Sequence, residues 1–441
     1  MKSPAHVITS IAARLTLSAI YGLTLALCKL TRRPRYMQPG LPTCVAVTGT
    51  FYNPGWFRAH MLPLVRCGVR EVVVVSDRSL QEIENVRFAC PPRWLTNLSG
   101  RALAKLAWLI ITAIRPRPDL FIGYHIFPGA VTALIAARLF GRPACYQMTG
   151  GPVEVVGGGW RAENPLMARL TRPSAVVEHL AIAMIRQFDL VVVRGSKAQE
   201  FLARHGIHES VAVITGSITA CSNVPPAERQ YDLVFVGRLT EIKRPVMFVE
   251  IAARVKRQFP SLRVAVVGTG PLLSALQQRS RELNIDDSIE FCGQRLDVAD
   301  IVARARVFVL TSRSEGFSIA MVEAMGAGAV PVVADVGELG DLIVSGESGY
   351  LVSPDELEAY VEPIVHVLRD SDLFERLSTC AAKIAMSRAA AEVIAAHWAN
   401  HLVALSRRSG NPCGAASRGE PRQAALDPTT GSRDRDSSLR P

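Results

Sequence analysis

The stretch RVFVLTSRSEGFSIAMVEAMGAGAVPVVAD, residues 306–335, decides the fold class of this chain. It begins as a short apolar strand, turns at Gly316, continues as a helix that Ser318 is placed to cap, and ends in a second apolar strand. Two strands that are apolar along their whole length, joined by a helix, are typical of a parallel sheet covered on both faces. The stretch therefore predicts one β–α–β unit of an α/β domain.

The same alternation of strand and helix extends toward the N-terminus of this unit. Further apolar runs are YDLVFVG (231–237), LRVAVVG (262–268) and SIEFCG (288–293), with helix-length segments between them. We therefore expect a doubly wound domain over residues 231–385.

A second set of strand-like runs occupies the N-terminal half. These runs are TCVAVTG (43–49), EVVVVSD (71–77), DLFIG (119–123), PACYQM (143–148), LVVVRGS (190–196) and VAVITG (211–216). They predict another doubly wound domain over residues 41–218, joined to the first by a linker, 219–230, that is rich in Pro, Ser and polar residues. Such sheets bind ligands at the carboxyl ends of their strands, so a site between the two domains is expected.

The chain ends carry most of the net charge of +11. Residues 1–40 hold +6 and no acid, and residues 406–441 hold +3, which leaves +2 for the body. A nucleic-acid binder needs a basic stripe on its folded surface, so no nucleic-acid partner is expected. The nine cysteines form no C-x-x-C pair, which favours a reducing cytoplasm, and no metal motif is present.

The first 40 residues are predicted to associate with a membrane. Residues 15–28 are apolar and are followed by Lys29, Arg32, Arg33 and Arg35. The run is short for a full span and no cleavage site follows it, so we expect a helix lying on an anionic surface at the inner face of the cytoplasmic membrane. The alternative is a helix packed on the protein's own surface. At the other end, residues 386–408 predict a helix that leaves the second domain, and 409–441 a disordered tail.

Three groups of residues at strand ends in the second domain suit a phosphorylated ligand. Arg238 and Lys243 follow the strand 231–237 and could hold a diphosphate, although such a pair is more often a solvated turn. The amides of Gly316, Phe317 and Ser318 would form an anion site at a helix start. Glu315 would lie in the loop, and Glu323 on the helix could accept two hydroxyls of a ribose. Gly268-Thr269-Gly270 is read as a turn.

With these residues in view, the segment 231–353 resembles the family-four, or group-one, retaining glycosyltransferases. The matching motifs are VGRLTEIKRP, VVGTGP, FCG, TSRSEGFSIAMVEAMGAGAVPVVADVG and SGYLV. Glu315 and Glu323 match the Glu-x7-Glu signature of that family. The resemblance implies a GT-B fold, in which two Rossmann-like domains face each other across a cleft and a C-terminal helix, here 386–408, crosses back to the first domain.

The resemblance also implies roles for individual residues. Arg238 and Lys243 would hold the diphosphate, Glu315 the donor sugar, and Glu323 the nucleotide ribose, with backbone contacts from Gly316, Phe317 and Ser318. In the first domain, Gly49 matches a glycine turn that faces the phosphates. His125 resembles a histidine near the donor sugar, shifted by one residue from the commonest spacing after Asp119. Departures at 216–219 and 337–341 leave the donor open.

The activity implied is transfer of a sugar from a nucleotide-diphosphate sugar to an acceptor hydroxyl, with retention and without a metal or cofactor. Bacterial polysaccharide or glycolipid synthesis is the expected setting, and the acceptor would be a glycan or a lipid-linked glycan. Two alternatives remain: a nucleotide-sugar epimerase of the same fold, and a non-catalytic scaffold of a polysaccharide assembly complex. The intact set Arg238, Lys243, Glu315 and Glu323 favours the transferase.

Overall fold

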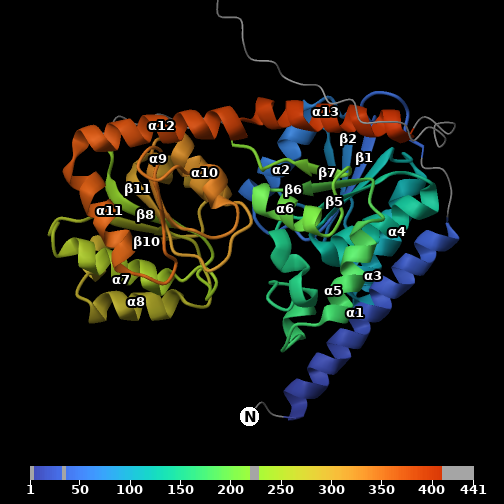
Figure 1. Cartoon of the computed structure of the whole chain (residues 1–441), viewed down its shortest axis with the longest axis horizontal. Helices are drawn as coiled ribbons and strands as arrows, with labels where there is room; N and C mark the ends of the chain where they lie inside the picture. The colour runs from blue at the N-terminus through green and yellow to red at the C-terminus, as the bar shows by residue number, and fades with distance from the viewer. Residues whose placement is uncertain (1–3, 32–35, 219–227, 410–441) are drawn as a thin grey trace, which may run out of the picture. The chain divides into compact units, whose positions relative to one another are not determined.

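The computed structural model describes residues 4–31, 36–218 and 228–409. Most of the predicted linker, 219–230, and nearly all of the predicted tail, 409–441, lie outside these residues, as do Arg32, Arg33 and Arg35. The described chain contains two parallel sheets, each with helices packed against it (Figure 1). Both sheets were expected from the alternating sequence pattern.

The first sheet has seven parallel strands in the order β3-β2-β1-β4-β5-β6-β7. Its strands are β1 (Cys44–Thr48), β2 (Glu71–Val75), β3 (Val86–Phe88), β4 (Leu120–Tyr124), β5 (Ala144–Gln147), β6 (Leu190–Val193) and β7 (Val211–Val213). The strand order reverses between β1 and β4, whose carboxyl ends lie side by side. This switch point is where doubly wound sheets bind ligands, and it places Gly49 and His125 next to each other.

Five α-helices follow the strands of the first sheet. They are α2 (Pro54–Arg66), α3 (Arg93–Ile114), α4 (Val131–Phe140), α5 (Ala175–Ile185) and α6 (Ser196–Arg204). Helix α3 is interrupted at Gly100, whose φ is 75°. Short turns connect the other elements: η1 (His125–Ala130), η2 (Gly151–Glu154), η3 (Val156–Gly158) and η4 (Met167–Arg169).

The second sheet has six parallel strands in the order β10-β9-β8-β11-β12-β13. They are β8 (Tyr231–Val236), β9 (Val264–Val267), β10 (Ile289–Gly293), β11 (Ala305–Leu310), β12 (Val330–Ala334) and β13 (Tyr350–Val352). Helices α7 (Pro245–Lys256), α8 (Leu273–Glu282), α9 (Val298–Ala303), α10 (Ile319–Gly326), α11 (Glu358–Arg369) and α12 (Ser371–Ala389) accompany them. Because β8 pairs with β11, the loops that follow these two strands are neighbours.

Two strands were missing from the sequence prediction. Strands β3 and β13 each have three residues, lie at a sheet edge and pair with a single neighbour. Neither is fully buried, so neither needs the continuous apolar run that marks the central strands. Their position is set by pairing with β2 and β12 rather than by a local pattern.

The last described helix packs against the first sheet's domain. Helix α12 ends at Ala389, Ala390 has an extended ψ of 144°, and α13 (Ala391–Ser409) then begins. Ile394, Trp398 and Leu402 of α13 are buried in the same hydrophobic cluster as Phe57 of α2. The break therefore falls at Ala390, a few residues after the expected start at 386.

Helix α1 (Pro4–Leu30) is long and apolar enough to cross a membrane by length and composition. One face of it packs against α5 and α4, beside which it lies in Figure 1. Leu17, Tyr21 and Cys28 on that face are buried in the core of the first domain. The alternative hypothesis, a helix packed on the protein's own surface, therefore holds for one face of α1. Its opposite face exposes apolar side chains, namely Val7, Ile8, Ile11, Leu15, Leu23 and Leu30.

Candidate active site

The loops after β8 and β11 bring Lys243 and Glu315 together. Lys243 Nζ donates to Glu315 Oε1 at 2.5 Å, and Ser312 Oγ donates to the same oxygen at 2.6 Å. The backbones of the two loops are also joined, because the Arg313 amide donates to the Ile242 carbonyl at 2.8 Å. A lysine and a carboxylate 72 positions apart are therefore held at one point above the sheet.

Arg238 has a different partner. Its guanidinium forms an ion pair with Glu163, which lies in the first domain between η3 and η4, and its side chain is 61% exposed. The sequence grouped Arg238 with Lys243, whereas the structure gives each cation its own carboxylate. An anion that binds both cations has to compete with Glu163 and Glu315 for them.

The turn before α10 and the loop after β12 meet at two glycines that leave no room for side chains. A Cβ on Gly316 would lie 2.2 Å from the Thr149 carbonyl oxygen of the first domain, and one on Gly337 would lie 1.8 Å from the Glu315 carbonyl oxygen. The Glu338 amide donates to the Gly316 carbonyl at 3.1 Å. The loop that carries Glu315 is thus confined by backbone on both sides.

Helix α10 starts as the sequence predicted. Ser318 is its cap residue, and the Ser318 hydroxyl accepts from the Met321 amide at 3.3 Å. Phe317 packs against a hydrophobic cluster of the second domain. Glu323 lies farther along the helix, where burial raises its pKa to about 7. At neutral pH its carboxyl group is therefore divided between the protonated and ionised forms.

In the first domain, Gly49 and His125 follow adjacent strands. A Cβ on Gly49 would lie 2.9 Å from Tyr124 Cβ, and the Gly49 carbonyl accepts from the buried ammonium of Lys105 at 3.1 Å. His125 begins η1 with a φ of 59°, the left-handed region that non-glycine residues seldom adopt. Its Nδ1 lies 3.0 Å from the carboxylate of Glu154.

Sequence reasoning missed Glu154 and Glu163. Both are isolated acids in the loop region after β5, with no motif around them that names a partner. Glu154 is the first acid after β5. Each pairing joins residues from different elements, so the local sequence carries no signal for it.

A second contact between the domains involves the segment 337–341. Glu338 accepts from the amides of Lys197 and Ala198 at 2.9 and 2.8 Å, and Asp341 accepts from the Ser196 amide at 2.6 Å. These amides are the exposed donors at the start of α6, where carboxylates are favoured. The departure from the family pattern seen in this segment thus coincides with two carboxylates that cap a helix of the other domain.

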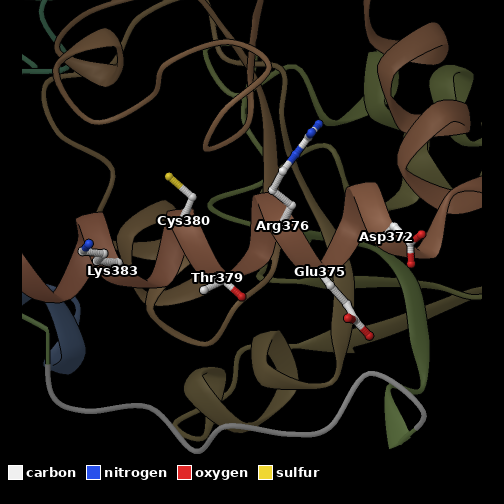
Figure 2. Close-up of a pocket in the computed structure, with 6 residues that line it drawn as sticks. All are labelled: Asp372, Glu375, Arg376, Thr379, Cys380 and Lys383. Atoms are coloured by element: carbon white, nitrogen blue, oxygen red, sulfur yellow. The ribbon is translucent and has the colours of Figure 1, made fainter.

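Figure 2 shows a surface hollow elsewhere, along α12. Its lining residues all come from that one helix: Asp372, Glu375, Arg376, Thr379, Cys380 and Lys383. The residues that the sequence singled out take no part in it. Within 4–31, 36–218 and 228–409, no group of three His, Cys, Asp or Glu side chains is placed to hold a metal ion.

The comparison with known proteins matches the region that contains Lys243 and Glu315. Residues 222–384 match the family model described as glycosyl transferases group 1. The N-acetyl-alpha-D-glucosaminyl L-malate synthase of Bacillus anthracis is 22% identical over 62% of this chain and 72% of its own length. The UDP-Gal:alpha-D-GlcNAc-diphosphoundecaprenol alpha-1,3-galactosyltransferase of Escherichia coli is 28% identical over 34% of this chain, and the match spans only 39% of that relative.

Solved structures share the architecture over most of the chain. Anabaena Alr3699/HepE in complex with UDP-glucose has a TM-score of 0.64 at 18% identity, covering 83% of this chain and 98% of the other. The sucrose-phosphate synthase of Thermosynechococcus elongatus has a TM-score of 0.65 at 18% identity, covering 83% and 100%. The two sheets thus define a GT-B fold. The segment 222–384 is therefore similar to the group 1 glycosyltransferases, within a chain that has the GT-B fold.

Proposed function

We propose that this protein transfers a sugar from a nucleotide-diphosphate sugar to an acceptor hydroxyl and retains the anomeric configuration. The observation that carries the proposal is the Lys243–Glu315 pair, fixed beside the Ser318-capped start of α10, with Glu323 on the same helix. The Anabaena neighbour is described in complex with UDP-glucose, which supports a donor of this class.

Each residue of the set has a role in holding the donor. The diphosphate binds Lys243, Arg238 and the amides of Gly316 to Ser318, and it displaces Glu163 from Arg238. Glu315, already oriented by Ser312, accepts hydroxyls of the sugar. Ionised Glu323 accepts the two ribose hydroxyls.

In the reaction, the bond from the anomeric carbon to the phosphate oxygen breaks, and a bond to the acceptor oxygen forms. Lys243 and Arg238 stabilise the negative charge that develops on the leaving diphosphate. A departing phosphate oxygen takes the acceptor's proton on the same face of the sugar, which gives retention. Gly49 and His125 belong to the first domain, whose Thr149 meets Gly316 beside this site. There Gly49 faces the phosphates, His125 faces the donor sugar, and together they exclude water.

We also propose that turnover needs no metal ion, because the two basic side chains and the helix start supply positive charge at the diphosphate. Turnover in EDTA tests this directly. Unchanged rates are expected, and a loss of rate that magnesium or manganese restores would contradict the proposal.

The acceptor is proposed to be a lipid-linked glycan, reached at the inner face of the cytoplasmic membrane. The support is the exposed apolar face of α1 together with exposed apolar residues of α3, namely Trp94, Leu98, Leu103, Ile111 and Ile114. Lys29 lies in the last turn of α1, and a basic residue near an anionic leaflet is worth about 1 kcal/mol. The name of the E. coli relative specifies a diphosphoundecaprenol acceptor.

A donor screen tests the central proposal. Thermal unfolding is followed with uridine, guanosine and adenosine diphosphates and their sugars, because a ligand at a hundred times its dissociation constant stabilises the fold by about 2.7 kcal/mol. NMR of the products made from the stabilising donor then gives their anomeric configuration. Conversion of the donor to its epimer would favour the epimerase alternative, and nucleotide binding without turnover would favour the scaffold.

A further inference from the structure

We propose that Glu154 is a positioning residue of this transferase, which fixes the imidazole of His125 in one tautomer and one orientation beside the donor site. This inference rests on the proposed function, because His125 matters only if a donor sugar binds next to it. Glu154 lies in η2, which follows β5, and His125 follows β4. The two residues therefore come from neighbouring strand ends of the first sheet.

The carboxylate of Glu154 is surrounded by hydrogen-bond donors. Oε1 accepts from His125 Nδ1 at 3.0 Å and from the Gly150 amide at 2.5 Å. Oε2 accepts from the Ile126 amide and the Tyr146 hydroxyl, both at 2.8 Å. These donors come from β5, from the start of η1 and from the Thr149–Gly150 turn, so one side chain joins three segments.

Glu154 is ionised despite its burial. Burial alone would raise its pKa, but the charge and hydrogen bond of His125, with the Gly150 amide and the Tyr146 hydroxyl, hold the pKa below its usual value. An ionised carboxylate can only accept hydrogen bonds, so the proton on the imidazole must be on Nδ1. In neutral His125 the lone pair is then on Nε2, which the Thr149 hydroxyl approaches to 3.3 Å and which lies on the exposed side chain.

The accessibility of the two side chains matches this division of roles. The side chain of His125 is 43% exposed, whereas that of Glu154 is 5% exposed. A ligand can therefore touch the imidazole but not the carboxylate. Burying a charge this deeply is costly, and an apolar side chain could fill the space instead. The need to orient the imidazole of His125 explains why a carboxylate is buried at this position.

Thr149 connects the His125–Glu154 pair to the proposed donor site of the second domain. The Thr149 hydroxyl lies 2.8 Å from His125 Nδ1 and 3.3 Å from Nε2, and the Thr149 carbonyl is the atom that Gly316 approaches. Trp56 lies nearly parallel to the imidazole, with an interplanar angle of 12° and 6.4 Å between ring centroids. Glu154 thus holds the imidazole next to the loop that carries Glu315.

The first experiment needs no variant. The full chain is labelled with nitrogen-15 histidine, and an H125Q variant identifies the signals of His125 among the nine histidines. Neutral His125 is expected as the Nδ1–H tautomer. A neutral ring protonated on Nε2 alone would overturn the proposal, whatever the enzyme's activity, so this result is independent of the proposed function.

The second experiment compares E154Q with E178Q. Glu178 also accepts a backbone amide of this region, that of Gly157 at 2.7 Å, and is not hydrogen-bonded to His125 within the described residues, so E178Q controls for loss of loop anchoring. In E154Q, kcat is expected to fall about 10- to 100-fold and the tautomer to change, as for other groups that orient a histidine. Affinity for UDP, the probe nucleotide, whose proposed contacts lie in the second domain, should change less than twofold. E178Q should keep the wild-type tautomer and rate.

A double variant separates positioning from folding. If Glu154 acts through His125, E154Q/H125Q has the same kcat as H125Q alone. Wild-type kcat in E154Q, or a double variant much slower than H125Q, would overturn the proposal. If no tested sugar nucleotide is turned over by the wild-type chain, the proposed function fails while the tautomer result still stands.

Discussion

Glu154 in the first domain and Glu323 in the second are both buried, yet their pKa values shift in opposite directions. The protein itself supplies Glu154 with an imidazole, two amides and a hydroxyl, and its pKa is held low. For Glu323 burial dominates and raises the pKa to about 7. Burial alone therefore does not set the state of an acid. A carboxylate that the fold surrounds with donors is ionised before any ligand arrives, whereas the state of Glu323 is open to pH and to ligand.

The residues around these two acids also differ in how far apart they lie along the sequence. In the second domain, Ser312, Glu315 and the cap of α10 lie within a few residues of one another. In the first domain, His125 and Glu154 are 29 positions apart. We therefore expect the second domain to bind the nucleotide by itself and the first domain to act on the reacting sugar.

The sharpest test of this division is Lys243→Ala compared with H125Q. Losing one preorganised positive contact is expected to lower kcat about 10²- to 10³-fold, or roughly 3–4 kcal/mol. K243A should also weaken UDP binding, whereas H125Q should leave it intact. Lys256→Ala is the matched control, because Lys256 pairs with Asp287 on the same domain. Equal losses of UDP affinity in K243A and H125Q would contradict this division of roles between the two domains.

The pKa of Glu323 predicts a stability effect of up to about 3 kcal/mol. Its folded-state pKa, about 7, lies above the usual value of 4.5. The folded protein therefore holds a proton that the unfolded chain loses between these pH values, and the contribution to stability falls as the pH rises from 4.5 to 7. Denaturant unfolding of E323Q should lack this decline. An unchanged pH dependence in E323Q would contradict the raised pKa.

The same pKa predicts a pH-dependent affinity for the nucleotide. If only ionised Glu323 accepts the ribose hydroxyls, the affinity for UDP should rise about tenfold between pH 6 and pH 8, following the ionised fraction. Calorimetric titration measures this. E323Q should bind UDP weakly at both values, whereas E315Q should keep the affinity for UDP and lose affinity for the sugar nucleotide. Identical losses in both variants would remove the division of roles between the two glutamates.

A further expected effect concerns the exposed face of α1. Leu15→Asp and Leu23→Asp should each reduce binding to anionic vesicles by roughly 2 kcal/mol, because each removes one exposed apolar side chain. Affinity for UDP should not change. Leu17→Ala on the buried face is the contrasting variant and should lower thermal stability instead. Full vesicle binding by both Asp variants would place the membrane contact elsewhere.

The two doubly wound sheets could be predicted from the sequence alone, and the sequence also pointed to strand ends of the second domain for the proposed donor site. Those features are local: apolar runs mark the central strands, and Ser318 stands three residues before the amide it caps. Residues 311–323 could therefore be read in order as strand end, turn and helix.

The pairing of residues that are distant in the sequence could not be predicted and follows from the packing of the chain. The Lys243–Glu315 pair spans 72 positions, the Arg238–Glu163 pair spans 75, and Gly316 meets Thr149 of the other domain. Three other features could not be predicted for the same reason. They are the edge strands β3 and β13, the packed face of α1 and the contact of Glu154 with His125. Each depends on which strand ends become neighbours when the sheets form, and that adjacency is a property of the packed chain rather than of any short stretch of it.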